Sequence, residues 1–140
     1  MVNPMSNDVA PAEVVSADTE AKYVLNELCT NVSKVEAAMV ATAEGLPIAE
    51  ELPDNVDNLL IGAMTAAVLA ASGRASEELQ KGHLSTILIQ AEEGMIFIKG
   101  LENGVLTVLT KPDANVGLVF LYMEKACKKI EKIISTSWMD

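Results

Sequence analysis

The sequence predicts a single small α+β domain whose elements follow the order helix, two strands, helix, three strands, helix. Three observations predict it. Half of the 140 residues are hydrophobic, which is enough for one core. Three long segments carry apolar residues at helical spacing. The remaining apolar runs are short and separated by turn residues such as Asn103-Gly104, a typical hairpin signal.

The chain begins with a segment that has no apolar period. Residues 1–18 contain two prolines and several small polar residues, so we expect a flexible arm ahead of a folded domain at residues 19–140. The first helix should start near Asp18 or Thr19, since either side chain can cap it. Its apolar stripe comprises Ala21, Leu25, Leu28, Val32 and Val35.

Five short segments read as strands. Val35 to Thr42 and Leu46 to Ala49 flank the turn Glu44-Gly45 and predict a first hairpin. Leu84 to Gln90, Met95 to Lys99 and Val105 to Thr110 are joined by tight turns. These last three strands should therefore form an antiparallel meander.

The second helix follows the loop that begins at Pro53. Asp54 or Asn55 is the expected N-cap, with Asp57 in the first turn. The helix should run to about Gln80, because Gly82 is a typical stop signal.

The third helix should be capped by Asp113 and present one apolar stripe to the core. Four lysines cluster late in it, where we expect them to oppose the negative C-terminal end of the helix. A basic contact patch is the functional alternative. The stripe comprises Val116, Phe120, Met123, Cys127, Ile130 and Ile134, and the lysines are Lys125, Lys128, Lys129 and Lys132.

The second helix is apolar almost all round between Leu59 and Ala71, whereas a helix lying on a sheet needs only one apolar stripe. Its other face therefore needs a cover. Small residues in two rows favour the same helix of a second copy, and thus a homodimer. The alternative is that the first or third helix covers this face. The rows are Gly62, Ala66 and Ala70, and Ala63, Ala67 and Ala71.

Charge and composition exclude several classes of partner. A net charge of −10 repels phosphate backbones, which argues against nucleic acid. The run from Leu59 to Ala71 is shorter than the about 20 residues of a membrane-spanning helix, so we expect no membrane insertion. Neither a signal peptide nor a cysteine framework is visible, so we expect a cytoplasmic protein with Cys29 and Cys127 as free thiols.

No catalytic constellation is apparent, and we expect a protein that is not an enzyme, without catalytic residues, cofactor or metal. The chain has no GxxxxGK[ST] phosphate loop, and its single histidine, His83, has no metal or triad partners nearby. Arg74 could act as an arginine finger on a GTPase. The favoured interpretation is a surface ion pair with Glu77 or Glu78 on the same helix.

An ordered set of segments resembles the Roadblock family, of the dynein light chain type. The set starts with the hairpin Met39 to Ala49 and the helix that is entered at Asp57 and continues as Ala63-Met-Thr-Ala-Ala67. Gly94 and the run Leu106 to Leu118 complete it. The likeness covers about residues 19–134, and the compact acidic chain is similar to prokaryotic members of the family, archaeal or bacterial.

The resemblance implies a profilin-like sandwich, in which a five-stranded antiparallel sheet has helix 2 on one face and helices 1 and 3 on the other. It also implies dimers that pair through helix 2 and the third strand. Through the third strand, the resemblance places Ser85, Ile87 and Ile89 in the dimer interface, beside the small residues of helix 2.

The resemblance further implies a partner, because family members regulate or scaffold Ras-like small GTPases. The bacterial gliding-motility regulators accelerate hydrolysis as homodimers. Such a GTPase would contact the ends of helix 2, at Asp57, Asn58, Arg74, Glu77 and Glu78. One alternative is a structural light chain or scaffold subunit with no effect on hydrolysis. Another is a small-ligand sensor, although the sheet faces offer no obvious polar pocket.

Overall fold

The computed structural model describes residues 17–139 and has the predicted order of elements. Residues 1–16 of the predicted arm lie outside the described residues. The last two arm positions, Ala17 and Asp18, belong instead to the first helix. The elements are α2 (Ala17–Asn31), β1 (Val35–Thr42), β2 (Pro47–Glu51), α3 (Asn58–Glu78), β3 (Thr86–Ala91), β4 (Gly94–Leu101), β5 (Gly104–Thr110) and α4 (Val116–Met139).

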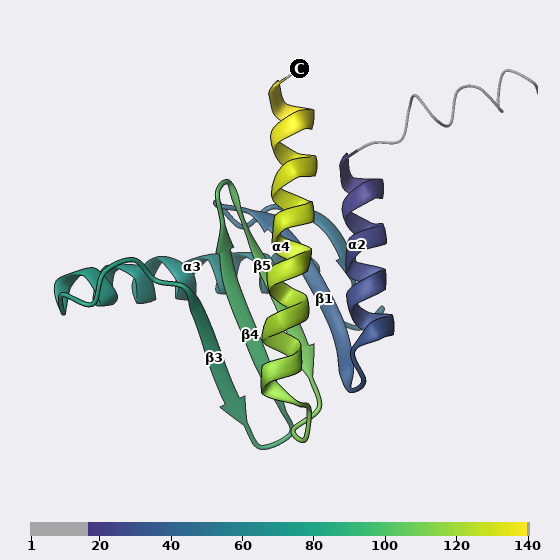
Figure 1. Ribbon diagram of the computed structural model, residues 1–140, viewed down its shortest axis with the longest axis horizontal. Coiled ribbons are helices and arrows are strands. Elements are labelled where there is room, and N and C mark those ends of the chain that lie inside the picture. Colours follow the sequence, from purple (N-terminus) through teal and green to yellow (C-terminus); the bar gives the residue numbers. More distant parts are fainter. Residues whose placement is uncertain (1–16, 140) are drawn as a thin grey trace, which may run out of the picture.

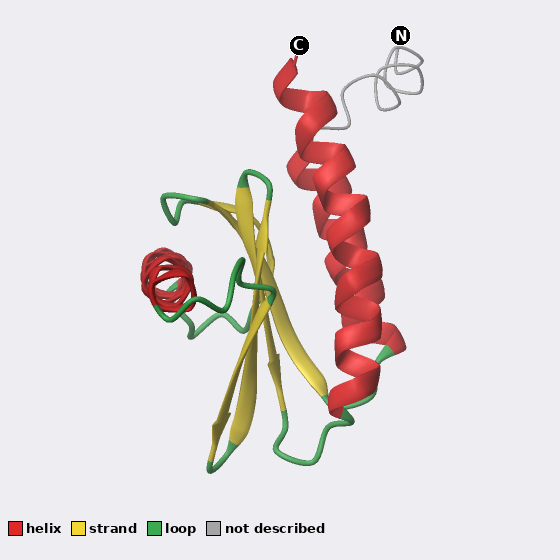
Figure 2. Cartoon of the chain, turned by 60° about the vertical axis from the view of Figure 1, so that its left-hand side comes forward, coloured by secondary structure: helices red, strands yellow, loops and turns green. Residues whose placement is uncertain are grey.

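The strands form one antiparallel sheet in the order β2-β1-β5-β4-β3. Helices α2 and α4 lie side by side on one face, and α3 crosses the other face (Figure 1, Figure 2). This arrangement confirms the predicted three-layer sandwich. Strands β2 and β3 are the two edges of the sheet.

The main core lies between the sheet and the helices α2 and α4. Strand residues alternate between the two faces, so Leu106 and Val108 of β5 join this core while Val105 and Thr107 face α3. Phe97 of β4 is fully buried and meets the ring of Phe120 edge to face, with ring centroids 5.2 Å apart.

The helix starts differ from the predicted ones. The N-cap of α3 is Asp57, whose Oδ1 accepts hydrogen bonds from the Leu59 and Leu60 amides, and not Asp54 or Asn55. Helix α4 starts at Val116, where Asn115 Oδ1 accepts from the Leu118 amide.

Asp113, the predicted cap of α4, pairs instead with the ammonium group of Lys34. This hydrogen bond lowers the pKa of the Asp113 carboxyl below its ordinary value. Asp113 therefore ties the start of the α4 region to the turn before β1, which is a long-range contact and not a local cap.

Candidate protein-interaction surface

The first half of α3 sits closely on the first hairpin. A Cβ added at Gly62 would lie 2.2 Å from the carbonyl oxygen of Gly45, so only glycine permits this approach. Gly45 itself has a φ of +99°, the left-handed region that favours glycine. At the start of the helix, Asn58 Nδ2 donates to both carboxylate oxygens of Glu50 on β2, at 2.8 and 2.7 Å. The N-terminal half of α3 is therefore fixed to its own sheet.

Gly62 was predicted to face a second copy, and its position corrects that prediction. It belongs to the contact with the chain's own hairpin. The other buried residue of the helix is Thr65, whose hydroxyl donates to the Ile61 carbonyl oxygen at 2.9 Å. The sequence carried two signals for this contact, a glycine in the hairpin turn and a glycine in an alanine-rich helix.

The opposite side of α3 is open. Only Gly62 and Thr65 are buried along its 21 residues. Ala63, Ala67 and Ala71 are exposed, as is Ala70, and Ala66 is half-buried. The large apolar side chains of this side are also uncovered, with Leu59 62% exposed, Leu60 54% and Met64 49%.

Because α2 and α4 lie on the other face of the sheet, neither helix covers the outer side of α3, and the alternative that they do is wrong. The extent of exposed apolar surface is typical of an interface.

The second half of α3 extends beyond the sheet (Figure 1). Residues 62, 69 and 73 share one side of the helix, because their spacing is close to whole turns. Gly62 meets the hairpin, and Leu69 still reaches β4, where a Cβ at Gly100 would lie 3.3 Å from it. At Gly73 an added Cβ would have no atom within 4 Å. The side of α3 that faces the sheet therefore continues past the edge and covers nothing there.

The edge below this overhang is β3, which pairs with β4 only. Ile87 and Ile89 are half-buried and, by the alternation from Leu88, point to the α3 face. Ser85 precedes the strand and is exposed. The opposite edge, β2, begins at Pro47 and packs against α2, which protects it. Strand β3 is thus the open edge of the sheet.

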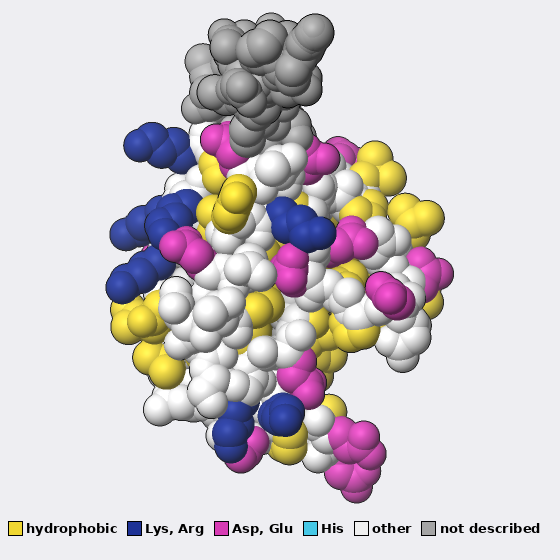
Figure 3. Space-filling model, turned by 90° about the vertical axis from the view of Figure 1, so that its right-hand side faces the viewer, with side chains coloured by type: hydrophobic (Ala, Val, Ile, Leu, Met, Phe, Trp, Pro, Cys, Tyr) yellow, Lys and Arg dark blue, Asp and Glu magenta, His cyan; other side chains and the backbone are white. Residues whose placement is uncertain are grey.

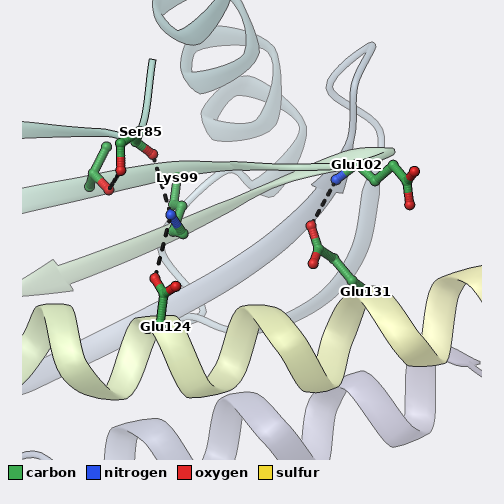
Figure 4. Close-up of polar contacts among 6 residues, drawn as sticks. Ser85, Lys99, Glu102, Glu124 and Glu131 are labelled. Atoms are coloured by element: carbon green, nitrogen blue, oxygen red, sulfur yellow. Dashed lines mark hydrogen bonds and ion pairs between the residues drawn. The ribbon is translucent and has the colours of Figure 1, made fainter. Parts of the chain in front are cut away.

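Lys99 connects the start of β3 to α4 (Figure 4). Its ammonium lies 3.5 Å from the Ser85 carbonyl oxygen and 3.6 Å from Glu124 Oε1. These contacts hold the segment that leads into the open edge against β4.

The residues predicted to touch a GTPase lie at the two ends of α3. Asp57 and Asn58 start the helix, whereas Arg74, Glu77 and Glu78 lie near its end, about 24 Å away at the helical rise. The structure does not bring the two groups together within one chain.

The predicted ion pair of Arg74 is confirmed, with Nε 3.8 Å from Glu78 Oε2. Both side chains are largely exposed, so this pair contributes little stability.

Reactive groups are sparse. Among residues 17–139, no group of three or more His, Cys, Asp and Glu side chains could hold a metal ion. The two cysteines are free thiols, as predicted. Burial raises the pKa of Cys29 to about 11 and that of Cys127 to about 12, which keeps both thiols protonated and unreactive at neutral pH.

Helix α3 has one further property. It is the only helix of the described chain that is long and apolar enough to cross a membrane, by length and composition alone. The prediction against membrane insertion was based on the run Leu59 to Ala71 alone, whereas the whole helix has 21 residues and therefore passes this length criterion. In the structure, one side of α3 lies on the sheet and the other side is exposed.

Together these features define a profilin-like α+β domain with an uncovered apolar helix above an open strand edge. The family comparison is consistent with this class. The chain belongs to the Roadblock/LC7 domain family, whose model matches residues 22–110.

The sequence relatives include proteins of an archaeon. The uncharacterized protein MJ0714 of Methanocaldococcus jannaschii is 38% identical over 97 residues, which cover 69% of this chain and 82% of that protein. A second uncharacterized protein of the same organism, MJ1340, is 36% identical over the same length and is covered to 85%.

Solved structures share the fold. Myxococcus xanthus MglB superimposes with a TM-score of 0.78 at 19% identity, covering 85% of this chain and 90% of MglB. A Schizosaccharomyces pombe profilin superimposes with a TM-score of 0.59 at 10% identity, covering 80% and 97%. The profilin-like fold predicted from the sequence is thereby confirmed.

Proposed function

We propose that this chain is a homodimeric, cytoplasmic protein-binding module that regulates or scaffolds a Ras-like small GTPase. The observation that carries the proposal is the open side of α3, which is apolar between Leu59 and Ala71 and belongs to a helix that extends past the β3 edge. In a monomer, this apolar surface would be exposed to solvent, whereas apolar patches of this kind are normally buried in an interface.

A second copy related by a two-fold axis would cover this surface. Two α3 helices would lie antiparallel, with the exposed alanines Ala63, Ala67 and Ala71 allowing close approach. The two β3 edges would pair, which would protect their free backbone groups. The sheet of the second copy would then lie below Gly73, where the chain's own sheet is absent.

Pairing would also assemble a composite surface from the two ends of α3. In an antiparallel pair, Asp57 and Asn58 of one copy approach Arg74 and Glu78 of the other. Asp57, Arg74 and Glu78 are charged and exposed, and Asn58 is half-buried. This surface would exist only in the dimer, so it suits recognition of a further protein.

The GTPase as partner follows from membership of the Roadblock family and its resemblance to the gliding-motility regulators. The partner would supply nucleotide, magnesium and the chemistry of hydrolysis. This dimer would act by preferring one of the partner's conformations. A finger role for Arg74 is not required, because its side chain is paired with Glu78 on a rigid helix.

A structural light chain or scaffold subunit is the second candidate. The open surface of α3 is built into the fold and needs no nucleotide-dependent change, which also suits constitutive assembly. In that case the dimer would bind its partner equally in both nucleotide states and leave hydrolysis unchanged.

Affinity capture from source lysate separates the two candidates. The immobilised full chain is exposed to lysate containing GDP or a non-hydrolysable GTP analogue. Retention of a Ras-like GTPase in one nucleotide state supports regulation, and capture of a larger protein in both states supports a scaffold.

The control variants are Ala67→Glu, on the open side of α3, and Ala43→Glu, on the exposed turn of the first hairpin. Both add one carboxylate to an exposed alanine. Ala67→Glu should lose the GTPase together with the dimer, whereas Ala43→Glu should keep the dimer. Failure to retain any GTPase in either state would contradict the proposal.

A further inference from the structure

The lysines of α4 do not lie where the sequence predicted. Helix α4 continues to Met139, and its last turn contains no basic residue. Lys125, Lys128, Lys129 and Lys132 therefore lie in the middle of the helix. The field of the helix dipole acts within the last turn, so it does not explain these lysines, and the predicted role as dipole partners is wrong.

The four lysines share one side of α4 with two exposed leucines, because positions three and four apart lie on one helix face. Leu118 is 37% exposed and Leu121 51%. We call this surface the α4 outer stripe, and it comprises Leu118, Leu121, Lys125, Lys128, Lys129 and Lys132.

Little within the chain neutralises the α4 outer stripe. Lys129 lies 3.2 Å from Glu27 of α2, and Lys125 lies over the ring of Tyr122. Across the described residues, neither Lys128 nor Lys132 makes an ion pair.

The acidic residues of α4 are directed elsewhere. Glu124 pairs with Lys99, and Glu131 accepts from the Glu102 amide at 3.0 Å (Figure 4). In a chain with net charge −10, a row of Lys and Arg side chains nevertheless follows one edge of the molecule (Figure 3). The stripe is therefore a local positive surface on an acidic protein.

A groove between α2 and α4 runs beside the stripe. Apolar side chains of Val24, Leu28 and Ala126 contribute to its lining. Lys125 and Lys129 line its α4 side, and Glu27, which is paired with Lys129, lines its α2 side. A groove between two helices fits a chain segment with one apolar and one charged side.

We propose that the α4 outer stripe and this groove bind an acidic amphipathic segment of another protein. Its apolar side chains would contact Leu118, Leu121 and the groove, and its carboxylates would pair with Lys128 and Lys132. This surface lies on the opposite face of the sheet from α3, so it can be occupied while α3 is in a dimer.

An acidic protein segment fits better than a membrane. A bilayer is flat and would meet both helices, including Glu20 and Glu27 of α2. Anionic lipid would be repelled by these carboxylates, whereas a narrow segment can place its own carboxylates at Lys128 and Lys132, which make no ion pair with the described acidic residues.

The test uses the full chain and a synthetic helical peptide with leucines on one side and glutamates on the other. Binding is followed by fluorescence anisotropy at low ionic strength and by amide chemical shifts. The test variant is Lys128→Glu with Lys132→Glu. The control is Lys81→Glu with Lys111→Glu, two exposed lysines outside the stripe that give the same net charge.

We expect peptide-induced shifts along α4 and α2, and an affinity reduced about tenfold or more in the test variant but not in the control. A peptide with glutamine in place of glutamate should bind correspondingly more weakly. Equal affinity for both double variants, or shifts confined to α3, would overturn the proposal.

Two other occupants are distinguished in parallel. Binding to phosphatidylserine vesicles that is lost in the test variant, without peptide binding, would identify a membrane surface and overturn the proposal. Concentration-dependent assembly beyond a dimer that the test variant abolishes would identify a second copy of this chain as the occupant, with the same consequence.

Discussion

The helices on the two faces of the sheet differ in how many of their apolar residues are buried. Helix α4 has one apolar side, and residues such as Val119 and Ile130 on it are completely buried. Helix α3 is apolar almost all round, yet it buries only Gly62 and Thr65. The more uniformly apolar helix is therefore the less buried one. Such exposure of apolar side chains on α3 is typical of a protein interface, whereas α4 completes the core.

Truncating a core side chain should have the largest effect. Phe97→Ala removes a fully buried ring that contacts Phe120, so we expect a loss of about 3–5 kcal/mol in the free energy of unfolding. Leu60→Ala on the open side of α3 should change monomer stability by less than about 0.5 kcal/mol while weakening the dimer. Urea unfolding at several protein concentrations measures both. Equal losses in the two variants would show that the faces do not differ.

The two glycines of α3 sharpen the comparison along one helix. Gly62→Ala places a methyl group against the Gly45 carbonyl oxygen and should destabilise the fold by about 1–3 kcal/mol. Gly73→Ala meets no atom of its own chain and should stabilise the helix of the monomer by about 0.5–1 kcal/mol. Thermal unfolding at low protein concentration checks the sign of each change. A destabilised Gly73→Ala monomer would contradict the described overhang.

A smaller effect on stability is expected from the exposed ion pair of Lys34 and Asp113. Its hydrogen bond lowers the pKa of Asp113, so the pair stabilises the fold above the ordinary Asp pKa of about 4, and this stability is lost as pH falls through the lowered pKa. Lys34→Met should be less stable than the wild type at pH 7. The difference should disappear toward about pH 2, and a difference that persisted there would have another cause.

The smallest effect should come from Arg74, at the exposed end of α3. Because Arg74 is paired with Glu78 and is 80% exposed, Arg74→Ala should change GTP hydrolysis by a captured partner only slightly. An arginine finger would contribute about 10³-fold or more. Single-turnover hydrolysis with either form of the dimer distinguishes these cases, and a loss on that scale would make Arg74 the finger.

The order of elements was predictable because apolar periods and turn residues act locally. Helix starts were less so. Asp54, Asn55 and Asp57 have similar capping ability, and Asp57 caps α3 in a structure where Asn58 is held by Glu50 of β2, a tertiary contact. A tertiary contact also decided the start of α4, because Asp113 pairs with Lys34 and Asn115 caps the helix in its place.

The sequence predicted that α3 carries an interaction surface, but it did not predict which side of the helix forms that surface. A helix that is apolar all round shows that a cover is needed, but it does not show which side lies on the sheet. Gly62 was assigned to the outer side for that reason. Only the fold shows that Gly62 meets Gly45 and that Ala67 is exposed.

Sedimentation velocity on the full chain, Ala67→Glu and Ala43→Glu tests most directly whether the open side of α3 is a dimer interface. We predict that the wild type and Ala43→Glu sediment with twice the chain mass of 14.9 kDa, and that Ala67→Glu is folded and sediments as a monomer. A monomeric wild type, or a folded Ala67→Glu that remains fully dimeric, would contradict the account.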